Sequence, residues 1–272
     1  MPNFVYHSAA ELSRPGLFLR EAVRELRAAP RIGLRLFMAQ LRARTRRSLL
    51  GYLWLVAPAA AITFLCAFLQ SQGVLNAGPT KLPYVLYVLS GVLLWQIFVE
   101  ALNQPVQKLL AARHLISRSP VPHEAILVSA ACEILLSTVV RVILLLAAFS
   151  IYGAPTMPGA GLLLSIATLI LLGFSIGLWV APWALLYDDA RQALSMLTTF
   201  WFFLTPIAYR PFSHGVIALN PVTPLLETAR ASLAGGGVSG AFLPVAVGGM
   251  VMLPIGWLLY RLARRHFVER LG

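Results

Sequence analysis

The stretch RARTRRSLLGYLWLVAPAAAITFLCAFL, residues 42–69, decides the class of this protein. A block of arginines runs directly into an apolar segment that begins at Leu53 and continues to Ser71. A helix that crosses the hydrocarbon core of a bilayer needs about 20 such residues. Arginines beside a span are retained on the cytoplasmic side of the membrane. The stretch therefore predicts a membrane-spanning helix together with its orientation.

The composition of the whole chain is that of a multi-span membrane protein. Hydrophobic residues make up 58% of the chain, charged residues make up 12%, and the mean hydropathy is +0.77. A soluble domain usually has about 25% charged residues. We expect an all-α integral membrane protein with a six-span domain over 53–260, preceded by cytoplasmic or interfacial helices in 1–52 and followed by a cytoplasmic tail, 261–272. The expected spans are residues 53–71, 84–104, 125–150, 160–184, 190–209 and 241–260.

The basic residues divide unevenly between the two sides of this topology. Eighteen of the 22 lysines and arginines fall in the N-terminal segment, the loop 105–123, the turn at Arg191 and the C-terminal tail. Three fall in the alternate segments, and Arg141 lies within a span. Both termini are therefore expected in the cytoplasm. Topology and anionic lipid head groups explain the net charge of +12 without a nucleic-acid partner.

The N-terminal segment is predicted to form two helical pieces separated by Pro30. In the first piece, apolar side chains such as Val23 and Leu26 recur at helical spacing, and charged side chains occupy the other faces. This pattern predicts a basic amphipathic helix on the membrane surface. A stripe that packs on the protein itself is the alternative. The second piece, residues 31–47, carries six arginines up to the first span.

The predicted cytoplasmic loop 105–123 is long for a connection between two spans. We expect an apolar and basic helix over residues 107–116, followed by the sequence SPVP at 119–122, where two prolines favour an extended backbone. A short helix with a stiff exit suits docking into a groove on another subunit. A surface helix without a partner fits the pattern equally well.

The segment between the fifth and sixth expected spans is predicted to contain a short helix. Thr223 is expected to cap its N-terminus, Pro224 to occupy its first position and Gly235 to follow its end. The resulting helix of eleven residues is too short to cross a bilayer. We therefore expect a re-entrant or interfacial element whose backbone groups are satisfied by protein or by water.

Sequence signatures of catalysis are missing. The chain has no GxxxxGK[ST], HExxH or GxSxG motif, and its five histidines lack metal-ligand spacing. Charged residues within spans need more care, because ionisable groups in hydrocarbon are costly and often functional. Glu133 and Arg141 lie eight residues apart on the third expected span, about 12 Å along a helix, so each is expected to face the bundle interior. Glu100 is expected near the cytoplasmic end of the second span.

Aromatic residues gather at two places along the chain. Tyr52 and Trp54 mark the start of the first span, and residues 200–203, with the sequence FWFF, form a run in the fifth. Tyr52 and Trp54 fit an aromatic belt at the membrane interface. A channel lining, on which flat aromatic faces stack against sugar rings, is the alternative.

Five sequence motifs occur in one order along nearly the whole chain: RTRRSLLGYLWLVAP (44–58), YVLYVLSGVLLWQIF (84–98), HLISRSPVPHEAIL (114–127), YDDARQALSMLTTFWFFLTPIAY (187–209) and LNPVTPLLETAR (219–230). Together they resemble the membrane subunits of type-two ABC exporters for cell-surface polysaccharides, the family of O-antigen, capsule and teichoic-acid permeases. The chain departs from the family's pattern where Ser117 and Arg118 replace a lysine pair and where Val121 replaces a phenylalanine.

The resemblance implies a homodimer of permease subunits that works with two copies of a cytoplasmic ABC ATPase. The pair would move a lipid-linked polysaccharide, of O-antigen or capsule type, across the bacterial plasma (inner) membrane. ATP and Mg²⁺ would be bound by the ATPase, so no cofactor, metal or catalytic residue is expected in this chain. The polymer path would lie at the homodimer interface, walled mainly by the first and fifth spans.

The resemblance also assigns roles to residues. The substrate path would be lined by Tyr52, Trp54, Phe200, Trp201, Phe202 and Phe203. The ATPase would contact the surface helix 17–29 and the helix 107–119, with the coupling residues Gln107, Lys108, Leu109, Arg113, His114, Leu115, Ile116 and Arg118. A gate on the far side, within 211–237, would contain Asn220, Pro221, Pro224, Glu227 and Arg230.

Two other functions stay open at this point. A type-two permease for a drug or for another lipid would share the fold. An intramembrane lipid-glycan transferase would need facing carboxylates or histidines near one leaflet, and the histidines of this chain do not provide them.

Overall fold

The computed structural model describes residues 15–45, 53–74, 82–112, 122–153, 159–209 and 219–271. The elements in these ranges are α1 (Pro15–Thr45), α2 (Leu53–Ser71), α3 (Tyr84–Ala111), α5 (His123–Ile151), α6 (Ala160–Leu186), α7 (Asp188–Leu204), α8 (Thr223–Leu233) and α9 (Phe242–Leu271). The all-α class predicted from the sequence is therefore confirmed for the described residues.

Four helices are long and apolar enough to cross a membrane: α3, α5, α6 and, over Phe242–Ala263, α9. They correspond to the second, third, fourth and sixth predicted spans. The first predicted span coincides with α2, whose apolar part Val56–Ser71 is shorter than these four. The fifth falls on α7, which has 17 residues and begins with Asp188 and Asp189. Four spans are thus supported by helix length and composition, and the total of six remains a prediction.

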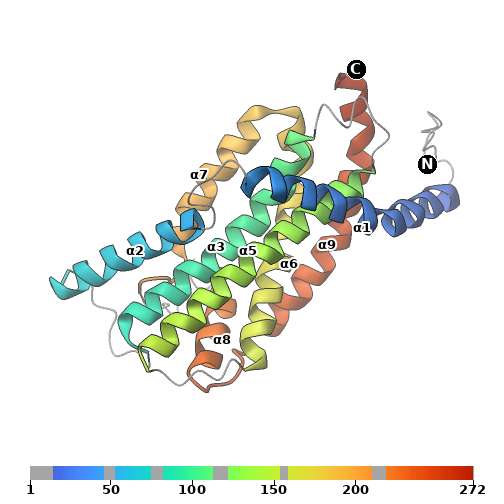
Figure 1. Ribbon diagram of the computed structural model, residues 1–272. Helices are drawn as coiled ribbons and strands as arrows, with labels where there is room; N and C mark the ends of the chain where they lie inside the picture. Colours follow the sequence, from blue (N-terminus) through green and yellow to red (C-terminus); the bar gives the residue numbers. More distant parts are fainter. Residues whose placement is uncertain are drawn as a thin grey trace.

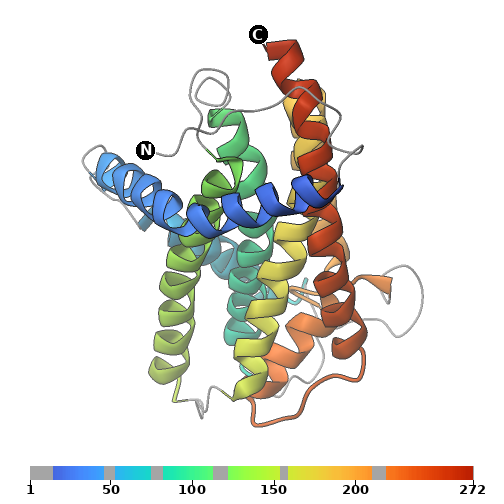
Figure 2. The same ribbon diagram turned by 90° about the vertical axis from the view of Figure 1, so that its right-hand side faces the viewer.

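The helix α3 is the central element of the bundle. Its apolar segment is the most deeply buried of the four candidate spans, and it packs against α2, α5 and α6. In Figures 1 and 2 the long helices α3, α5, α6 and α9 run alongside one another. The helix α1 crosses them near one end, and α8 lies at the opposite end.

The helix α6 approaches α3 closely because two glycines face it. Gly173 and Gly177 lie one turn apart, a small-xxx-small spacing that lets helix backbones touch in a membrane. A Cβ atom on Gly173 would lie 2.6 Å from the carbonyl oxygen of Phe98, and one on Gly177 would collide with the carbonyl oxygen of Leu102. Direct contact between the two backbones therefore holds this pair together.

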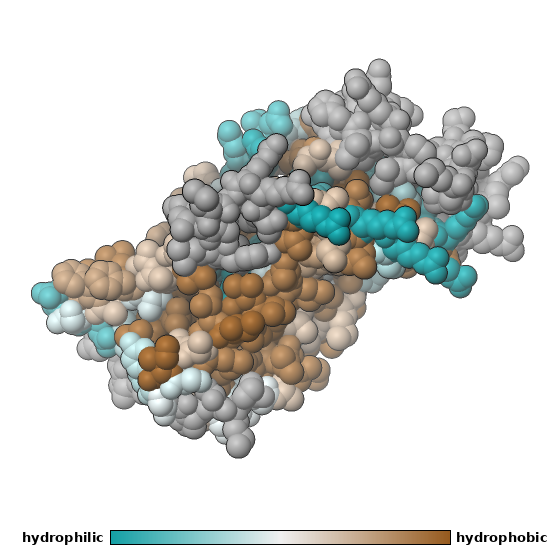
Figure 3. Space-filling view, in the orientation of Figure 1, coloured by the Kyte–Doolittle hydropathy of each residue, from teal (hydrophilic) through white to brown (hydrophobic). Residues whose placement is uncertain are grey.

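The outer surface of the long helices is apolar. On α5, the side chains of Leu135, Val139 and Ile143 are all exposed. Figure 3 shows this hydrophobic surface beside the hydrophilic side chains of α1. An apolar surface of this kind marks contact with lipid or with another membrane protein.

Four helix boundaries in the structure differ from those expected from the sequence. The helix α1 continues through Pro30, so the N-terminal segment is not divided there. The helix α3 continues through Pro105 to Ala111, so residues 105–111 extend the span helix and do not begin a separate one. In both cases packing against neighbouring helices overrides the local preference of proline. The helix α7 ends at Leu204, because Pro206 disfavours the helical conformation at the residue before it. The helix α9 runs to Leu271 across the boundary predicted for the tail.

We predict that Gly173→Leu separates α3 from α6 and destabilises the protein. Overpacking of this kind costs about 1–3 kcal/mol, which lowers the melting temperature of a domain of this size by about 2–12 °C. Thermal unfolding in detergent measures the effect. Gly248→Leu is the matched control, since a Cβ atom there meets nothing within 4 Å. Equal melting temperatures for the two variants would contradict the proposed α3–α6 contact.

Candidate functional site

The residues predicted for a far-side gate all lie on α8 or directly before it: Asn220, Pro221, Pro224, Glu227 and Arg230. The buried side chain of Arg230 fastens α8 to α3. Its Nη2 donates hydrogen bonds to the carbonyl oxygens of Tyr87 (3.0 Å) and Ile207 (2.9 Å), and its Nη1 donates to that of Pro206 (2.8 Å). The guanidinium also lies 3.7 Å from the centre of the Tyr87 ring, a cation–π contact. Arg230 therefore joins α8, α3 and the turn after α7.

Burial sets the electrostatics of α8, which lies outside the four candidate spans. Burial lowers the pKa of Arg230 to about 10, so the guanidinium remains protonated at neutral pH. Burial raises the pKa of Glu227, and the charge of Arg230 opposes that shift. Gly91 of α3 leaves the space that the guanidinium fills, because a Cβ atom there would collide with Nη2. The hydrogen bonds to carbonyl oxygens compensate the cost of burying this charge.

Asn220 holds the end of α7 against the start of α8. Its Oδ1 accepts hydrogen bonds from Trp201 Nε1 and from the Val222 backbone N–H, both at 3.0 Å. Its Nδ2 donates to Thr205 Oγ1 at 2.9 Å. One amide side chain thus fixes the angle between two helices.

The helix α8 has the predicted length and the predicted end. It contains 11 residues, Thr223–Leu233, with Pro224 in its first turn. Gly235 follows with a φ of 73°, in the left-handed region that glycine adopts without strain. The prediction that Thr223 caps the helix is wrong, because the helix begins one residue earlier and its N-cap is Val222.

The aromatic run on α7 divides between two faces. Trp201 and Phe202 contact aromatic rings of α3, and the ring centroid of Trp201 lies 5.1 Å from that of Phe98. Phe200 and Phe203 are instead 56% and 68% exposed. Two of the four predicted path residues on α7 therefore lie on an open face, and the other two dock the helix.

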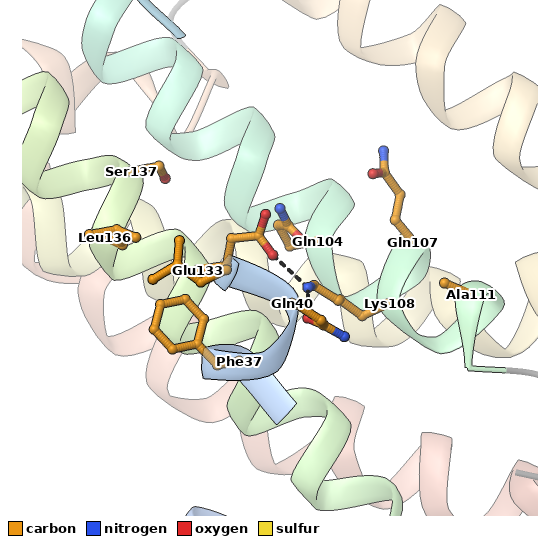
Figure 4. Close-up of a pocket in the computed structure, with 10 residues that line it drawn as sticks. Phe37, Gln40, Gln104, Gln107, Lys108, Ala111, Glu133, Leu136 and Ser137 are labelled. Atoms are coloured by element: carbon orange, nitrogen blue, oxygen red, sulfur yellow. Dashed lines mark hydrogen bonds and ion pairs between the residues drawn. The ribbon is translucent and has the colours of Figure 1, made fainter. Parts of the chain in front are cut away.

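The coupling residues that fall within α3 have different surroundings. Gln107 is exposed, whereas Leu109 is fully buried. Lys108 Nζ lies 2.5 Å from Glu133 Oε2 of α5 and also donates to Gln40 of α1. Figure 4 shows both partners pointing toward the ammonium group. Of these three coupling residues, the structure brings Gln107 to the outer surface of the protomer.

Several predicted residues lie outside the described part of the chain: Tyr52, Arg113, His114, Leu115, Ile116 and Arg118. The side chain of Trp54 is also outside it, although its backbone belongs to α2. Their roles in the path and in coupling remain predictions.

The charged residues of the spans pair between α3 and α5. Glu133 binds Lys108, and Arg141 binds Glu100. Arg141 Nη1 also donates to Ser137 Oγ at 3.2 Å. Each helix thus carries one carboxylate and one cation eight residues apart, and the order of the two pairs makes the helices antiparallel. We call these two contacts the ion-pair ladder.

A row of polar residues lies on α3, and of its members only Glu100 and Gln107 were singled out from the sequence. Its members recur at helical spacing along the second half of the helix: Gln96, Glu100, Asn103, Gln104 and Gln107. They border two cavities with volumes of about 390 Å³ each, one beside α1 and α5 and the other beneath α2. The helical spacing of polar residues inside an apolar run was the sequence signal for this row.

A second buried cluster fastens α1 to the bundle. Arg261 Nη1 of α9 lies 3.1 Å from Glu25 Oε2 of α1 and 2.8 Å from Glu124 Oε1 of α5. Beside it, His123 Nδ1 lies 2.7 Å from the Tyr260 hydroxyl oxygen. The three charged partners are far apart in the sequence, so no local pattern predicts them. Within the described residues, no group of three or more His, Cys, Asp or Glu side chains could hold a metal ion.

Comparison with known proteins shows that the sequence of this chain matches a protein family. Residues 34–234 match the family described as ABC-2 type transporter. The chain belongs to the ABC-2 type transporter family. A curated relative of this ABC-2 protein, the O-antigen export system permease protein RfbA of Myxococcus xanthus, is 27% identical over 220 residues. That alignment covers 77% of this chain and 82% of the relative.

The matched part of this ABC-2 type transporter begins inside α1 and ends just after α8. It therefore contains the ion-pair ladder, the aromatic run and the Arg230 contacts, whereas α9 lies beyond it. Family membership makes the chain the membrane permease component of a transporter and implies an ABC ATPase as its partner. The four apolar helices fit an integral membrane protein.

We predict that Glu100→Arg destabilises this transporter, because it leaves Arg141 unpaired and adds a second buried cation. Breaking a fully buried pair in this way costs about 3–5 kcal/mol, and a smaller loss is expected here because the Glu100 side chain is 16% exposed. The double variant Glu100→Arg, Arg141→Glu rebuilds the pair with reversed charges and is expected to recover most of the loss. The yield of monodisperse protein and its melting temperature measure both effects. A double variant no more stable than the single one would contradict the pairing.

Proposed function

We propose that the chain is the permease subunit of an ATP-driven exporter that moves a lipid-linked polysaccharide, of O-antigen or capsule type, across the bacterial plasma (inner) membrane. The observation that carries this proposal is the likeness to an O-antigen export permease over most of both chains. The apolar outer surface of the long helices is consistent with it (Figure 3).

The proposed exporter contains two copies of this chain, which meet through α2 and α7. Both helices pack on α3; in Figure 1 α2 extends to the left-hand edge, and α7 lies above it. On α7 the buried residues are Leu194 and Thr198, and on α2 the side chains of Phe64 and Phe68 are exposed. A second copy, related by two-fold symmetry, would cover part of these faces and leave the remainder as the wall of a path.

The outward rings of Phe200 and Phe203 are the best candidates for contact with the glycan. The apolar face of a sugar ring stacks on an aromatic ring without a directional hydrogen bond, so the polymer can slide from one ring to the next. Trp201 and Phe202 serve this path indirectly, because their contacts with α3 fix the direction of α7. Tyr52 and Trp54 remain proposed path residues on the strength of the sequence.

The energy for export would come from two cytoplasmic ABC ATPases, which bind the ATP and Mg²⁺. The helix α1 and the end of α9 lie at the same end of the bundle (Figure 2). Together with the distribution of arginines, this supports an orientation with both termini in the cytoplasm. The ATPases would dock on the exposed, arginine-rich face of α1, on Gln107 and on residues 113–118.

Two buried clusters of contacts between helices suggest how movement of the ATPases would be transmitted to the proposed path. The Glu25–Arg261–Glu124 cluster ties α1 to α5 and α9, and Arg230 ties α8 to α3. In the proposed mechanism, closure of the ATPases pushes on α1 and on the end of α3. Each protomer then moves largely as one body, and the path widens between the two copies. The coupling free energy is carried by packed helices and buried charges.

Reconstitution tests the proposed function. The chain is coexpressed with a candidate ABC ATPase from the same genome, and the complex is placed in lipid vesicles that contain the lipid-linked glycan of the same cells. We expect glycan to cross the membrane only when ATP is hydrolysed. Hydrolysis that responds to a drug or to another lipid, without movement of glycan, would contradict the proposal and favour the alternative type-two permease.

The same vesicles test the path. We predict that the double variant Phe200→Ala, Phe203→Ala keeps its assembly and its ATP turnover but loses most glycan transport, because both rings lie on the open face. Trp201→Ala is the comparison and is expected to lower the yield of folded complex, since its ring and Nε1 hold α7 in place. Unchanged transport in the double variant would remove both phenylalanines from the path.

A further inference from the structure

We propose that the polar groove along α3, between α2 and α5, binds uncharged sugar units of the exported glycan within a single protomer. This inference rests on the proposed function for the identity of the glycan. Its starting point is the pair of cavities beside α3, each of about 390 Å³. Both are lined by Gln104 and Gln107, so they lie next to each other along α3. We call the two together the α3 groove; each has the size of an ordinary small-molecule site.

The hydrogen-bonding groups of the α3 groove are largely unused. The side chains of Gln96, Gln104 and Gln107 make no hydrogen bond with any described residue. The Asn103 side chain makes one hydrogen bond, in which Nδ2 donates to the Val99 carbonyl oxygen at 2.9 Å. Among the side chains of the lining, Gln96 Oε1 and Arg141 Nε are buried without a hydrogen-bond partner. Because buried polar atoms normally have a partner, Gln96 Oε1 indicates a ligand that donates a hydrogen bond, and the half-buried amides of Asn103 and Gln104 can donate and accept further ones.

The charges of the α3 groove favour a neutral ligand. Its two cations, Lys108 and Arg141, are paired with two carboxylates, Glu133 and Glu100. The net charge of this lining is therefore zero, which gives a phosphate or pyrophosphate group little attraction. The hydroxyl groups of a sugar each donate one hydrogen bond and accept others, and a neighbouring pair of them matches a side-chain amide.

The position of the α3 groove suits a substrate that approaches from the proposed path. Pro58 of α2 forms part of its wall, and the exposed face of α2 borders the path between the two copies. In the proposed orientation the groove occupies the cytoplasmic half of α3. Sugar units next to the lipid carrier would therefore meet these amides before the rest of the polymer enters the path.

Saturation-transfer NMR tests this assignment directly. The probes are the methyl glycosides of glucose, galactose, mannose and N-acetylglucosamine, with inorganic phosphate as the charged probe. The exporter, with its ATPase, is held in lipid nanodiscs without glycan. We expect the wild type to transfer saturation to the ring protons of at least one glycoside and to show no competition by phosphate. Phosphate competition, or no transfer to any glycoside, would overturn the assignment.

Two variants locate the binding in the α3 groove. Gln96→Leu and Gln104→Leu remove amides and are each expected to weaken glycoside binding about tenfold, the effect of one good hydrogen bond. Gln72→Leu is the matched control, because Gln72 is exposed beyond the end of α2. Equal binding by all three variants would overturn the assignment, and either groove variant suffices if the other does not fold.

Transport in vesicles separates this inference from the proposed function. If the wild type exports glycan and the groove variants bind and export normally, the α3 groove is not a sugar site although the exporter is correctly identified. If the wild type exports no glycan, the proposed function fails, whereas loss of glycoside binding in Gln104→Leu still supports a sugar site in the groove.

Discussion

A charge or a hydrogen-bonding group that is removed from water needs a partner inside the protein. In this chain the helix α3 supplies partners for charged side chains of α5 and α8. At one end of α3, Tyr87 accepts the hydrogen bond of Arg230 and lies beneath its guanidinium. Toward the other end, Glu100 and Lys108 pair with charges of α5. Loss of either set would leave a charge without compensation, so α3 cannot slide freely against α5 or α8.

The division between fixed and open parts of the protomer follows from this arrangement. Backbone contact at Gly173 joins α6 to the central helix, and Arg261 joins α1 and α9 to α5. The contacts named here do not involve α2 or α7, on which large apolar side chains such as Phe64 and Phe203 are exposed. A transporter needs a stable body and a surface that can open, and this chain separates the two by the density of its packing and charge pairing.

Much of the fold could be predicted because it depends on local patterns. Apolar runs located α3, α5, α6 and α9, and the combination of Pro224 with Gly235 located α8 to within one residue. Pro30 was misleading, since proline lowers the helical preference of an isolated segment but neighbouring helices can override it, and α3 continues through Pro105 in the same way. Boundaries that depend on such competition cannot be obtained from local propensity.

The candidate site was less accessible to sequence reasoning because its contacts join distant segments. The spacing of Glu133 and Arg141 argued against a bond between them, but their partners on α3 depend on the register of two antiparallel helices. Likewise, all four residues at 200–203 are aromatic, and only packing against α3 distinguishes the inward Trp201 from the outward Phe203. Arg230 was singled out as a gate residue by resemblance, and its role as the fastening between α8 and α3 required the structure.

Whether α3 and α8 move together as one rigid body is tested most directly by distances measured between spin labels. Labels at the exposed positions Ala111 and Val238 report on this joint movement within one copy, when labelled copies are diluted with unlabelled ones. A label at Leu65 of α2 reports on the separation of the two copies. Binding of ATP to the complete exporter is expected to leave the first distance unchanged and to alter the second. A change in the distance between Ala111 and Val238 on ATP binding would contradict the joint movement of α3 and α8.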